Sequence, residues 1–431
     1  MLASPFLLLT IPLTGIFTLP SGTTEVRSEI RIPEGAHDLK IVGNHSLLHA
    51  SAGFQGRAVL SCHNCRSIEL RDFTIDGNRA ALEKPMPMPP SNVSFARFYG
   101  NNGILIENSR GVRIANAQFK NITNFAVLVS ASGAVTLSHV SVEDSGSLDP
   151  KGRNNTSGGV LLEEGTSDFT VRDSTFNRIR GNAVWTHSCY GSPRNGKGEI
   201  AGNTFSEIGR DAIQVGHAHD VAVTRNKGTR IGYPPAIVDI EHLAVPVAVD
   251  TAGDVNNSVY SLNTFTEIDG QCFDLDGFHN GEVSSNSCAN RGRAEDYPFG
   301  HFGIALNNAN PDMQSRNIRI VDNLLEGMKF GGIFVIGSGH QILRNRLLNV
   351  NTAHCNDTQA KFGCIWKADE PDMLRSGIYL STSGARSDPA RDNTIESNTI
   401  TGWGMGKYCI QSASGVKLQQ NHIRRNTCSA R

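Results

Sequence analysis

Apolar and polar residues alternate strictly in the segment Gln271–Gly277. Phe273 and Leu275 fall on one face of the predicted strand. Asp274 and Asp276 fall on the other face, where two adjacent carboxylates repel each other unless a cation, a proton or a substrate meets them. The segment therefore predicts a short strand with an apolar inner face and a chemically active outer face.

The same six-residue pattern, called the repeat strand below, recurs with inner residues at its third and fifth positions. Its copies lie at residues 57–62, 102–107, 125–130, 158–163, 182–187, 211–216, 245–250, 271–276, 302–307, 331–336, 376–381 and 408–413. The shortest spacings between copies are about 22 to 24 residues, and such a period indicates a solenoid.

A turn, a second alternating run, a corner with Asn and a third run follow the repeat strands, as at Asn203, Asn263 and Asn323. Asn tolerates left-handed backbone and hydrogen-bonds locally, so it suits stacked corners. We therefore expect an all-β chain in which each coil contributes three short strands, stacked in parallel on the next coil.

This repeat resembles the right-handed parallel β-helix of the pectin-lyase-like superfamily, which includes polygalacturonases, pectate lyases and mannuronan epimerases. The resemblance implies a single β-helix domain over residues 39–431, with about 12 coils, and an N-terminal segment over residues 1–38. It implies a carbohydrate-active protein, although the fold hosts several chemistries and some proteins that only bind.

Composition and net charge limit the classes of partner that we expect. The net charge is −1 and 19% of residues are charged, so no polybasic surface favours nucleic acid or an anionic membrane. We expect a monomer with no membrane span that meets a polysaccharide or oligosaccharide. Residues 1–19 are apolar like a signal peptide but lack its basic start, and an N-terminal strand and cap is the alternative. We expect a secreted, periplasmic or cell-surface protein.

Nine cysteines are present. Cys355 and Cys364 bracket a loop and are placed to close a disulfide, which would fit an oxidising compartment. Cys272 and Cys409 share the small-residue second position of the repeat strand, so we expect a packing role for both.

Long insertions precede the repeat strands at residues 78–101, 146–157, 230–244, 289–301 and 351–375. All of them leave the coil at the same corner and can wall the same face, where recognition residues collect. In the resembled families that corner borders the substrate groove. Arg293 and Tyr297, both in one insertion, are therefore candidate sugar contacts.

The outer positions of the repeat strand form two columns, and polar residues concentrate in the middle coils. The sixth position carries Glu163, His187, Asp250, Asp276 and Asn307, and the fourth carries Trp185, Gln214 and Asp274. The predicted catalytic residues are Asp250, Asp274, Asp276, His187 and His301. The predicted substrate contacts are Glu163, Trp185, Gln214, Asn307, Arg293 and Tyr297.

Strand geometry would place Asp250, Asp274 and Asp276 in a triangle with backbone separations of roughly 5 to 8 Å. Glycoside cleavage by acid catalysis uses a protonated and an ionised carboxyl group at about that distance. The triangle resembles the three-Asp centre of polygalacturonases, but the adjacent Asp-Asp pair and the Gly-His-Gly motif of that family are missing here.

Three functions remain open at this stage. A glycoside hydrolase would use the aspartates directly and would need no metal or cofactor. A polysaccharide lyase or uronate epimerase would use them to hold Ca²⁺, with an Arg, Lys, His or Tyr as base. A carbohydrate-binding surface protein would use the same groove without chemistry. The sugar and its linkage are not encoded in any motif.

Overall fold

The computed structural model describes residues 10–241, 245–309, 313–355 and 363–430. The chain divides into two compact units. The N-terminal unit comprises Met1–Gly181 with His187–Gly198, and the C-terminal unit comprises Asn182–Thr186 with Glu199–Arg431. The candidate signal peptide at residues 1–19 lies partly outside the described residues. The expectation of one domain over residues 39–431 stays a prediction.

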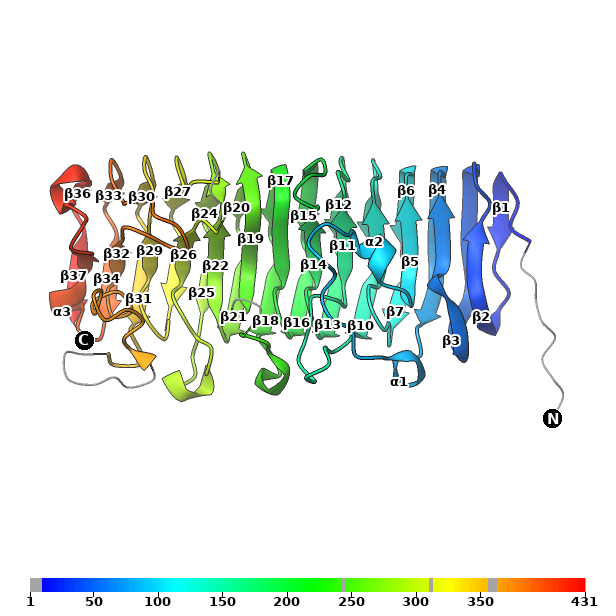
Figure 1. Cartoon of the computed structure of the whole chain (residues 1–431), viewed down its shortest axis with the longest axis horizontal. Coiled ribbons are helices and arrows are strands. Elements are labelled where there is room, and N and C mark those ends of the chain that lie inside the picture. The colour runs from blue at the N-terminus through cyan, green and yellow to red at the C-terminus, as the bar shows by residue number, and fades with distance from the viewer. Residues whose placement is uncertain (1–9, 242–244, 310–312, 356–362, 431) are drawn as a thin grey trace. The chain divides into compact units, whose positions relative to one another are not determined.

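Strands of the N-terminal unit stack in parallel in three columns, which are labelled in Figure 1. Its strands are β1 (Gly15–Thr18), β2 (Gly22–Ile32), β3 (His37–His63), β4 (Arg66–Asp76), β5 (Asn102–Glu107), β6 (Arg110–Ala115), β7 (Gln118–Lys120), β8 (Val127–Ser130), β9 (Thr136–Ser138), β10 (Ser141–Ser145), β11 (Val160–Glu163), β12 (Thr170–Arg172) and β13 (Thr175–Ile179). Its helices are α1 (Arg79–Leu82) and α2 (Phe95–Phe98).

The C-terminal unit repeats this architecture. Its first column, which carries the repeat strands, contains β17 (Ile213–Thr224), β19 (Val247–Asn256), β22 (Gln271–Asp276), β26 (Ile304–Asn307), β29 (Ile333–Val335), β32 (Ile378–Leu380) and β35 (Ile410–Ser412). The second contains β20 (Val259–Ser261), β24 (Glu282–Ser284), β27 (Arg319–Val321), β30 (Gln341–Leu343), β33 (Thr394–Glu396) and β36 (His422–Arg424). The third contains β16 (Thr204–Ile208), β18 (Lys227–Ile231), β21 (Thr264–Ile268), β25 (Ser287–Ala289), β28 (Leu324–Glu326), β31 (Arg346–Val350), β34 (Thr399–Gly402) and β37 (Thr427–Ala430).

A few elements complete the list. The division between the units cuts β14 (Val184–His187), which pairs with β17 in the first column, and β15 (Asn195–Ala201). The remaining elements are β23 (Phe278–His279), which pairs with the end of β19, α3 (Met405–Tyr408) and the 3₁₀ turns η1 (Pro235–Ile237), η2 (Ala294–Asp296) and η4 (Leu418–Gln420). Within the described ranges, no helix is long and apolar enough to cross a membrane.

The core lies inside the coils. The third and fifth positions of the repeat strand are buried in most coils, as at Phe273 and Leu275, and confirm the predicted inner face. Parallel pairing of short strands, three to a coil, confirms the predicted β-helix.

The asparagine corners form a continuous ladder in the C-terminal unit. Each buried amide donates to the side-chain oxygen of the next one, through Asn203, Asn226, Asn263, Asn286, Asn323, Asn345, Asn398 and Asn426. A buried amide left without partners would cost stability, so the ladder fixes the register of successive coils.

Disulfides join four pairs of cysteines: Cys62 with Cys65, Cys272 with Cys288, Cys355 with Cys364, and Cys409 with Cys428. The Cys355–Cys364 pair agrees with the predicted loop closure. The packing role predicted for Cys272 and Cys409 is wrong, because each is bonded to a cysteine on the third strand of its own coil.

Candidate active site

Two aspartates stand in direct register on neighbouring strands of the C-terminal unit. Asp250 of β19 pairs with Asp274 of β22, and Gln214 of β17 pairs with Asp250. Trp185 precedes Gln214 in the same column. The three strands β17, β19 and β22 lie side by side in Figure 1. Neighbouring strands are about 4.8 Å apart, so the two carboxyl groups extend from backbones at that separation.

The alignment of the repeat strands with one another placed Asp250 in the wrong column. It predicted Asp250 beside Asp276 at the sixth position, whereas the structure pairs Val249 with Phe273 and so moves Asp250 to the fourth position. The cause is the run Val245, Val247 and Val249, whose alternation fits two registers that differ by two residues.

Both aspartates are more enclosed than an open outer face suggests. Asp250 is 7% exposed and Asp274 is 9% exposed, although both alternate with core residues along their strands. Burial is the largest cause that raises the pKa of each carboxyl well above its ordinary value. Neighbouring negative charges act in the same direction, from Asp211 and Asp274 on Asp250, and from Asp276 and Asp211 on Asp274.

Gln214 distinguishes the two carboxyl groups. Its amide Nε2 donates a hydrogen bond to Oδ2 of Asp250, and its Oε1 accepts one from Nδ2 of Asn182 at 2.9 Å. The bond from Gln214 lowers the pKa of Asp250, because it favours the ionised form. By contrast, Oδ1 of Asp274 is buried and has no hydrogen-bond partner within the described part of the chain.

Asp211 belongs to the same cluster but was not among the predicted site residues. It is fully buried, lies 3.5 Å from Nε of Arg210 through Oδ2, and accepts the N–H of Val247 at 3.0 Å. Burial raises its pKa to about 6, against the opposing charge of Arg210. The sequence carried little indication of this role, because other coils also place polar residues at the first position of the repeat strand, as at Asn102, Asn182 and Gln271.

Asp276 and Asn307 lie at the sixth position of neighbouring strands and pair in register. Oδ1 of Asp276 accepts the N–H of Ala309 at 2.5 Å, and Oδ1 of Asn307 accepts the N–H of Ala385 at 3.0 Å. Burial raises the pKa of Asp276, and the Ala309 bond opposes the rise. Both side chains therefore fix loops beside the aspartate pair.

His301 reaches the start of the strand that carries Asp274. Its Nδ1 lies 3.3 Å from Nε2 of Gln271, and its ring stands edge-on to Trp366 with centroids 5.6 Å apart. Burial and the charge of Lys329 lower the pKa of His301 to about 4, so it is neutral near pH 7. Trp366 is 66% exposed and offers an open aromatic face.

Tyr297, a predicted sugar contact, does not face solvent in this structure. Tyr297 is 1% exposed, donates its hydroxyl to Oε2 of Glu267 and accepts the N–H of Gly292 at 2.8 Å. It therefore anchors its insertion instead of stacking on a ligand. Arg293 in the same insertion is exposed, and its guanidinium pairs with Asp296 at 3.2 Å.

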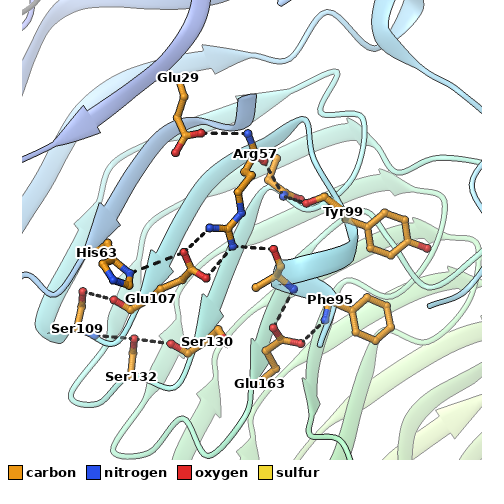
Figure 2. A network of polar contacts seen from close by, with 12 residues as sticks. Glu29, Arg57, His63, Phe95, Tyr99, Glu107, Ser109, Ser130, Ser132 and Glu163 are labelled. Carbon is orange, nitrogen blue, oxygen red and sulfur yellow. Dashed lines mark hydrogen bonds and ion pairs between the residues drawn. The ribbon is translucent and has the colours of Figure 1, made fainter. Parts of the chain in front are cut away.

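Glu163 and His187 belong to the N-terminal unit. Figure 2 shows Glu163 beneath α2, where its Oε2 accepts the N–H of Phe95 at 2.8 Å and its Oε1 accepts that of Ala96 at 2.9 Å. Glu163 has no exposed surface, so in this structure it holds α2 and does not face solvent, unlike the open contact that its column position suggested. The ring of His187 packs edge-on against Phe95 at 5.3 Å.

The structure thus brings Asp250, Asp274, Asp276, Gln214, Asn307 and Trp185 onto neighbouring strands of one unit. Within the described ranges, no three His, Cys, Asp or Glu side chains are grouped so as to hold a metal ion. The absence of a metal or cofactor from the mechanism stays a prediction.

A family model described as right-handed β-helix region matches residues 58–242. No curated protein matches the sequence. Among solved structures, PfbA, a surface adhesin of Streptococcus pneumoniae, is 14% identical with a TM-score of 0.58, over 78% of this chain and 84% of that one.

Two other similar structures are those of enzymes. DFA-IIIase from Arthrobacter chlorophenolicus A6, without its lid and in complex with GF2, has a TM-score of 0.57 at 14% identity, over 95% of this chain and 88% of that one. A hyperthermoactive exopolygalacturonase from Thermotoga maritima has a TM-score of 0.54 at 9% identity, over 78% and 84%. The chain therefore has the right-handed parallel β-helix fold that its repeat predicted. At these identities the likeness defines the fold alone.

Proposed function

We propose that this protein is a secreted or surface carbohydrate-active enzyme that hydrolyses a glycosidic bond, with Asp250 and Asp274 as its reacting carboxyl groups. The observation that carries the proposal is the register of these two residues, which sets two buried carboxyl groups with raised pKa values side by side. Such a pair retains a proton near neutral pH, as acid catalysis of glycoside cleavage requires.

The surroundings assign the roles. Asp274 is the acid, because its unpartnered oxygen and the charges of Asp276 and Asp211 favour its protonated form. It gives its proton to the leaving glycosidic oxygen. Asp250 is the ionised partner, because Gln214 donates to it and Arg210 lies near it. Backbones about 4.8 Å apart fit the short carboxyl separation of retaining enzymes better than the longer one of inverting enzymes.

In the retaining sequence Asp250 bonds to the anomeric carbon as the glycosidic bond breaks. Water then replaces Asp250, and Asp274 takes the proton of that water, which restores both carboxyl groups. Exposed Trp366, beside His301, provides a face on which a sugar ring can stack. The four disulfides support an oxidising compartment, consistent with a protein outside the cytoplasm.

The test is a screen of the purified protein on a panel of polysaccharides and oligosaccharides, followed by mass spectrometry of the products. The proposal expects products that each gain the elements of water, activity that chelator leaves unchanged, and retained anomeric configuration by NMR. Unsaturated products whose formation stops on chelation would instead establish the lyase alternative, with the aspartates holding Ca²⁺.

A binding protein is the second candidate, and the low exposure of the aspartates favours it. At 7% and 9% exposed, Asp250 and Asp274 offer little surface to a bulky polymer unless nearby loops move. Retention of a glycan from the panel on immobilised protein, with no product after prolonged incubation, would decide for this function.

A further inference from the structure

The insertion before β5 forms a strap, defined here as residues 83–101, which contains α2. One end is fixed at Glu83, which pairs with Arg180 and accepts the N–H of Leu148 at 3.2 Å. The other end is fixed where the N–H of Asn101 donates to the carbonyl of Gly56. Between these ends the strap runs through a proline-rich segment, residues 85–90, into α2.

The strap covers apolar side chains on the outer face of the N-terminal unit. Leu105, Leu128 and Leu161 occupy the fourth position of β5, β8 and β11 and pair in register. They alternate with core residues along their strands, yet all three are buried. Helix α2 packs against β8, and Figure 1 shows it in front of these strands. The buried ring of Phe95 completes the contact.

Two side chains fasten α2, as Figure 2 shows. Glu163 accepts the N–H groups of Phe95 and Ala96, which have no acceptor inside the helix. Ser94, at the N-cap, makes no capping bond, so the carboxyl group of another strand takes that role. Arg57 donates to the carbonyl of Ala96 at 2.7 Å and pairs with both oxygens of Glu107.

We propose that the strap is a pH-controlled cover, which protonated Glu163 keeps closed over the leucine row and which ionisation of Glu163 loosens. The proposal does not depend on the catalytic activity proposed above. It assigns to Glu163 a conformational role that its outer-column position alone did not indicate.

The direction of the pH effect follows from the burial of Glu163 in the closed strap. Burial raises its pKa to about 7 from an ordinary value of 4.5, and this outweighs the two backbone hydrogen bonds, which lower it. In an open strap the carboxyl group meets water and its pKa falls back toward the ordinary value. The stability of the closed strap relative to the open strap is therefore greatest below about pH 4.5. It decreases as pH rises and reaches its minimum above pH 7. The opening equilibrium rises by up to about 300-fold across that range.

The charged and titratable groups around Glu163 come from each neighbouring element. They are Arg57 from β3, Glu107 from β5 with His63 at 3.9 Å, Glu164 next in sequence, His187 at the end of β14, and Cys189 from the segment after β14. Glu164 raises the pKa of Glu163, whereas Arg57 opposes that effect through its own charge. Arg57 keeps its charge throughout the pH range of interest.

Hydrogen exchange of the Phe95 and Ala96 amides in the full chain, corrected for intrinsic rates, tests the proposal. In the wild type, protection should fall by about 70-fold between pH 5 and pH 8, which is most of the full range on a logarithmic scale. In Glu163→Gln, which keeps one acceptor but cannot ionise, protection should be lower at pH 5 and independent of pH. Glu143→Gln, an exposed change in the same unit, should retain the wild-type profile.

Two further measurements keep the test independent of folding defects. The ¹³C shift of the Glu163 carboxyl group should titrate near pH 7 in the wild type. Trypsin should cut after exposed Arg97 faster at pH 8 than at pH 5, relative to a peptide substrate at each pH. Flat protection of Phe95 and Ala96 across this range in the wild type would overturn the proposal, as would an unchanged pH dependence in Glu163→Gln.

Discussion

Asp250 and Asp274 lie side by side, in register on two adjacent parallel strands. Gln214 lies beside Asp250 on the preceding strand of the same column. This relationship places two mutually repelling carboxyl groups where little water reaches them. One proton shared between them relieves both the repulsion and part of the desolvation cost. The column therefore provides a proton donor and an ionised partner without any metal in the proposed mechanism.

The Asp274→Asn variant tests the proposed acid. Turnover on a substrate that the wild type cleaves should fall by about 10²- to 10⁴-fold, because the amide cannot give up a proton. The free energy of unfolding at pH 8 should rise by about 1 kcal/mol or more, since a buried repulsive charge is removed. Steady-state kinetics and urea unfolding measure the two effects.

Asp392→Asn is the matched control, because Asp392 is exposed and pairs with Arg391 on the surface. It should leave both turnover and stability within error. Full activity of Asp274→Asn beside an unchanged control would place the acid elsewhere.

Gln214→Leu tests a positioning role. Loss of the donor to Asp250 should raise the pKa of that carboxyl group, so the acidic limb of the kcat/KM profile should move to higher pH by roughly one unit. Gln411→Leu is the control, since Gln411 holds the same strand position in β35 and its amide donates to the Lys407 carbonyl. If the acidic limb of the kcat/KM profile did not move in Gln214→Leu, Gln214 would only pack in the column and would not set the pKa of Asp250.

Periodicity made the fold predictable. Inner residues such as Phe273 recur at fixed positions, and corner asparagines such as Asn263 recur with them, because every coil must bury the same face and satisfy the same amide. A pattern of period 2, however, is unchanged by a shift of two residues. For that reason the column of Asp250 could not be fixed from the sequence, and strand pairing decided it.

The loops were less predictable for a different physical reason. Tyr297 lies in an insertion whose polar sequence is typical of a solvent-exposed surface, but its hydroxyl reaches Glu267, about one coil earlier in the chain. Glu163 is similar, since α2 buries it from another part of the chain. Burial of such residues depends on tertiary contacts that no local pattern contains.

Tertiary contacts also change the expected role of one outer-face charge, Glu107. Glu107 shares the sixth position with Glu163 and would be a neutral site on an open face. The structure instead pairs it with Arg57, which also holds Ala96. Glu107→Gln should therefore increase hydrogen exchange of the strap amides by a similar factor at every pH, in addition to the pH dependence that Glu163 still provides. A variant with unchanged exchange would leave Glu163 as the main fastener.

Disulfides should stabilise the last coils. Cys409 and Cys428 are 19 residues apart, and opening a loop of that size costs about 3 kcal/mol of stability. The Cys409→Ser, Cys428→Ser double variant should therefore unfold at lower urea concentration than the wild type. Cys189→Ser is the control, because Cys189 is the one cysteine among the described residues that is outside a disulfide. If both variants lost the same stability, the loss would be caused by the change in side-chain packing and not by the missing disulfide.

Asp269 should make the chain less stable as pH rises. It is fully buried, its Oδ1 accepts the N–H of Phe299 at 2.7 Å, and its Oδ2 has no hydrogen-bond partner among the residues that the structure describes. Burial raises its pKa to about 7, while the bond from Phe299 and the charge of Lys329 lower it. A raised pKa in the folded state means that the stability is present below the unfolded value of 3.8 and is lost as pH rises through 7.

The wild type should therefore be less stable at pH 8 than at pH 5, and Asp269 alone should account for about 2.5 kcal/mol of that loss. Asp269→Asn should lose part of this pH dependence, becoming more stable than the wild type at pH 8 but not at pH 5. Other buried carboxyl groups whose pKa values are raised, among them Asp211, Glu163 and the aspartate pair, account for the remaining pH dependence of stability. Urea unfolding at both pH values, with Asp392→Asn as control, measures the difference. If Asp269→Asn kept the full wild-type slope, the ionisation of Asp269 would not be linked to folding.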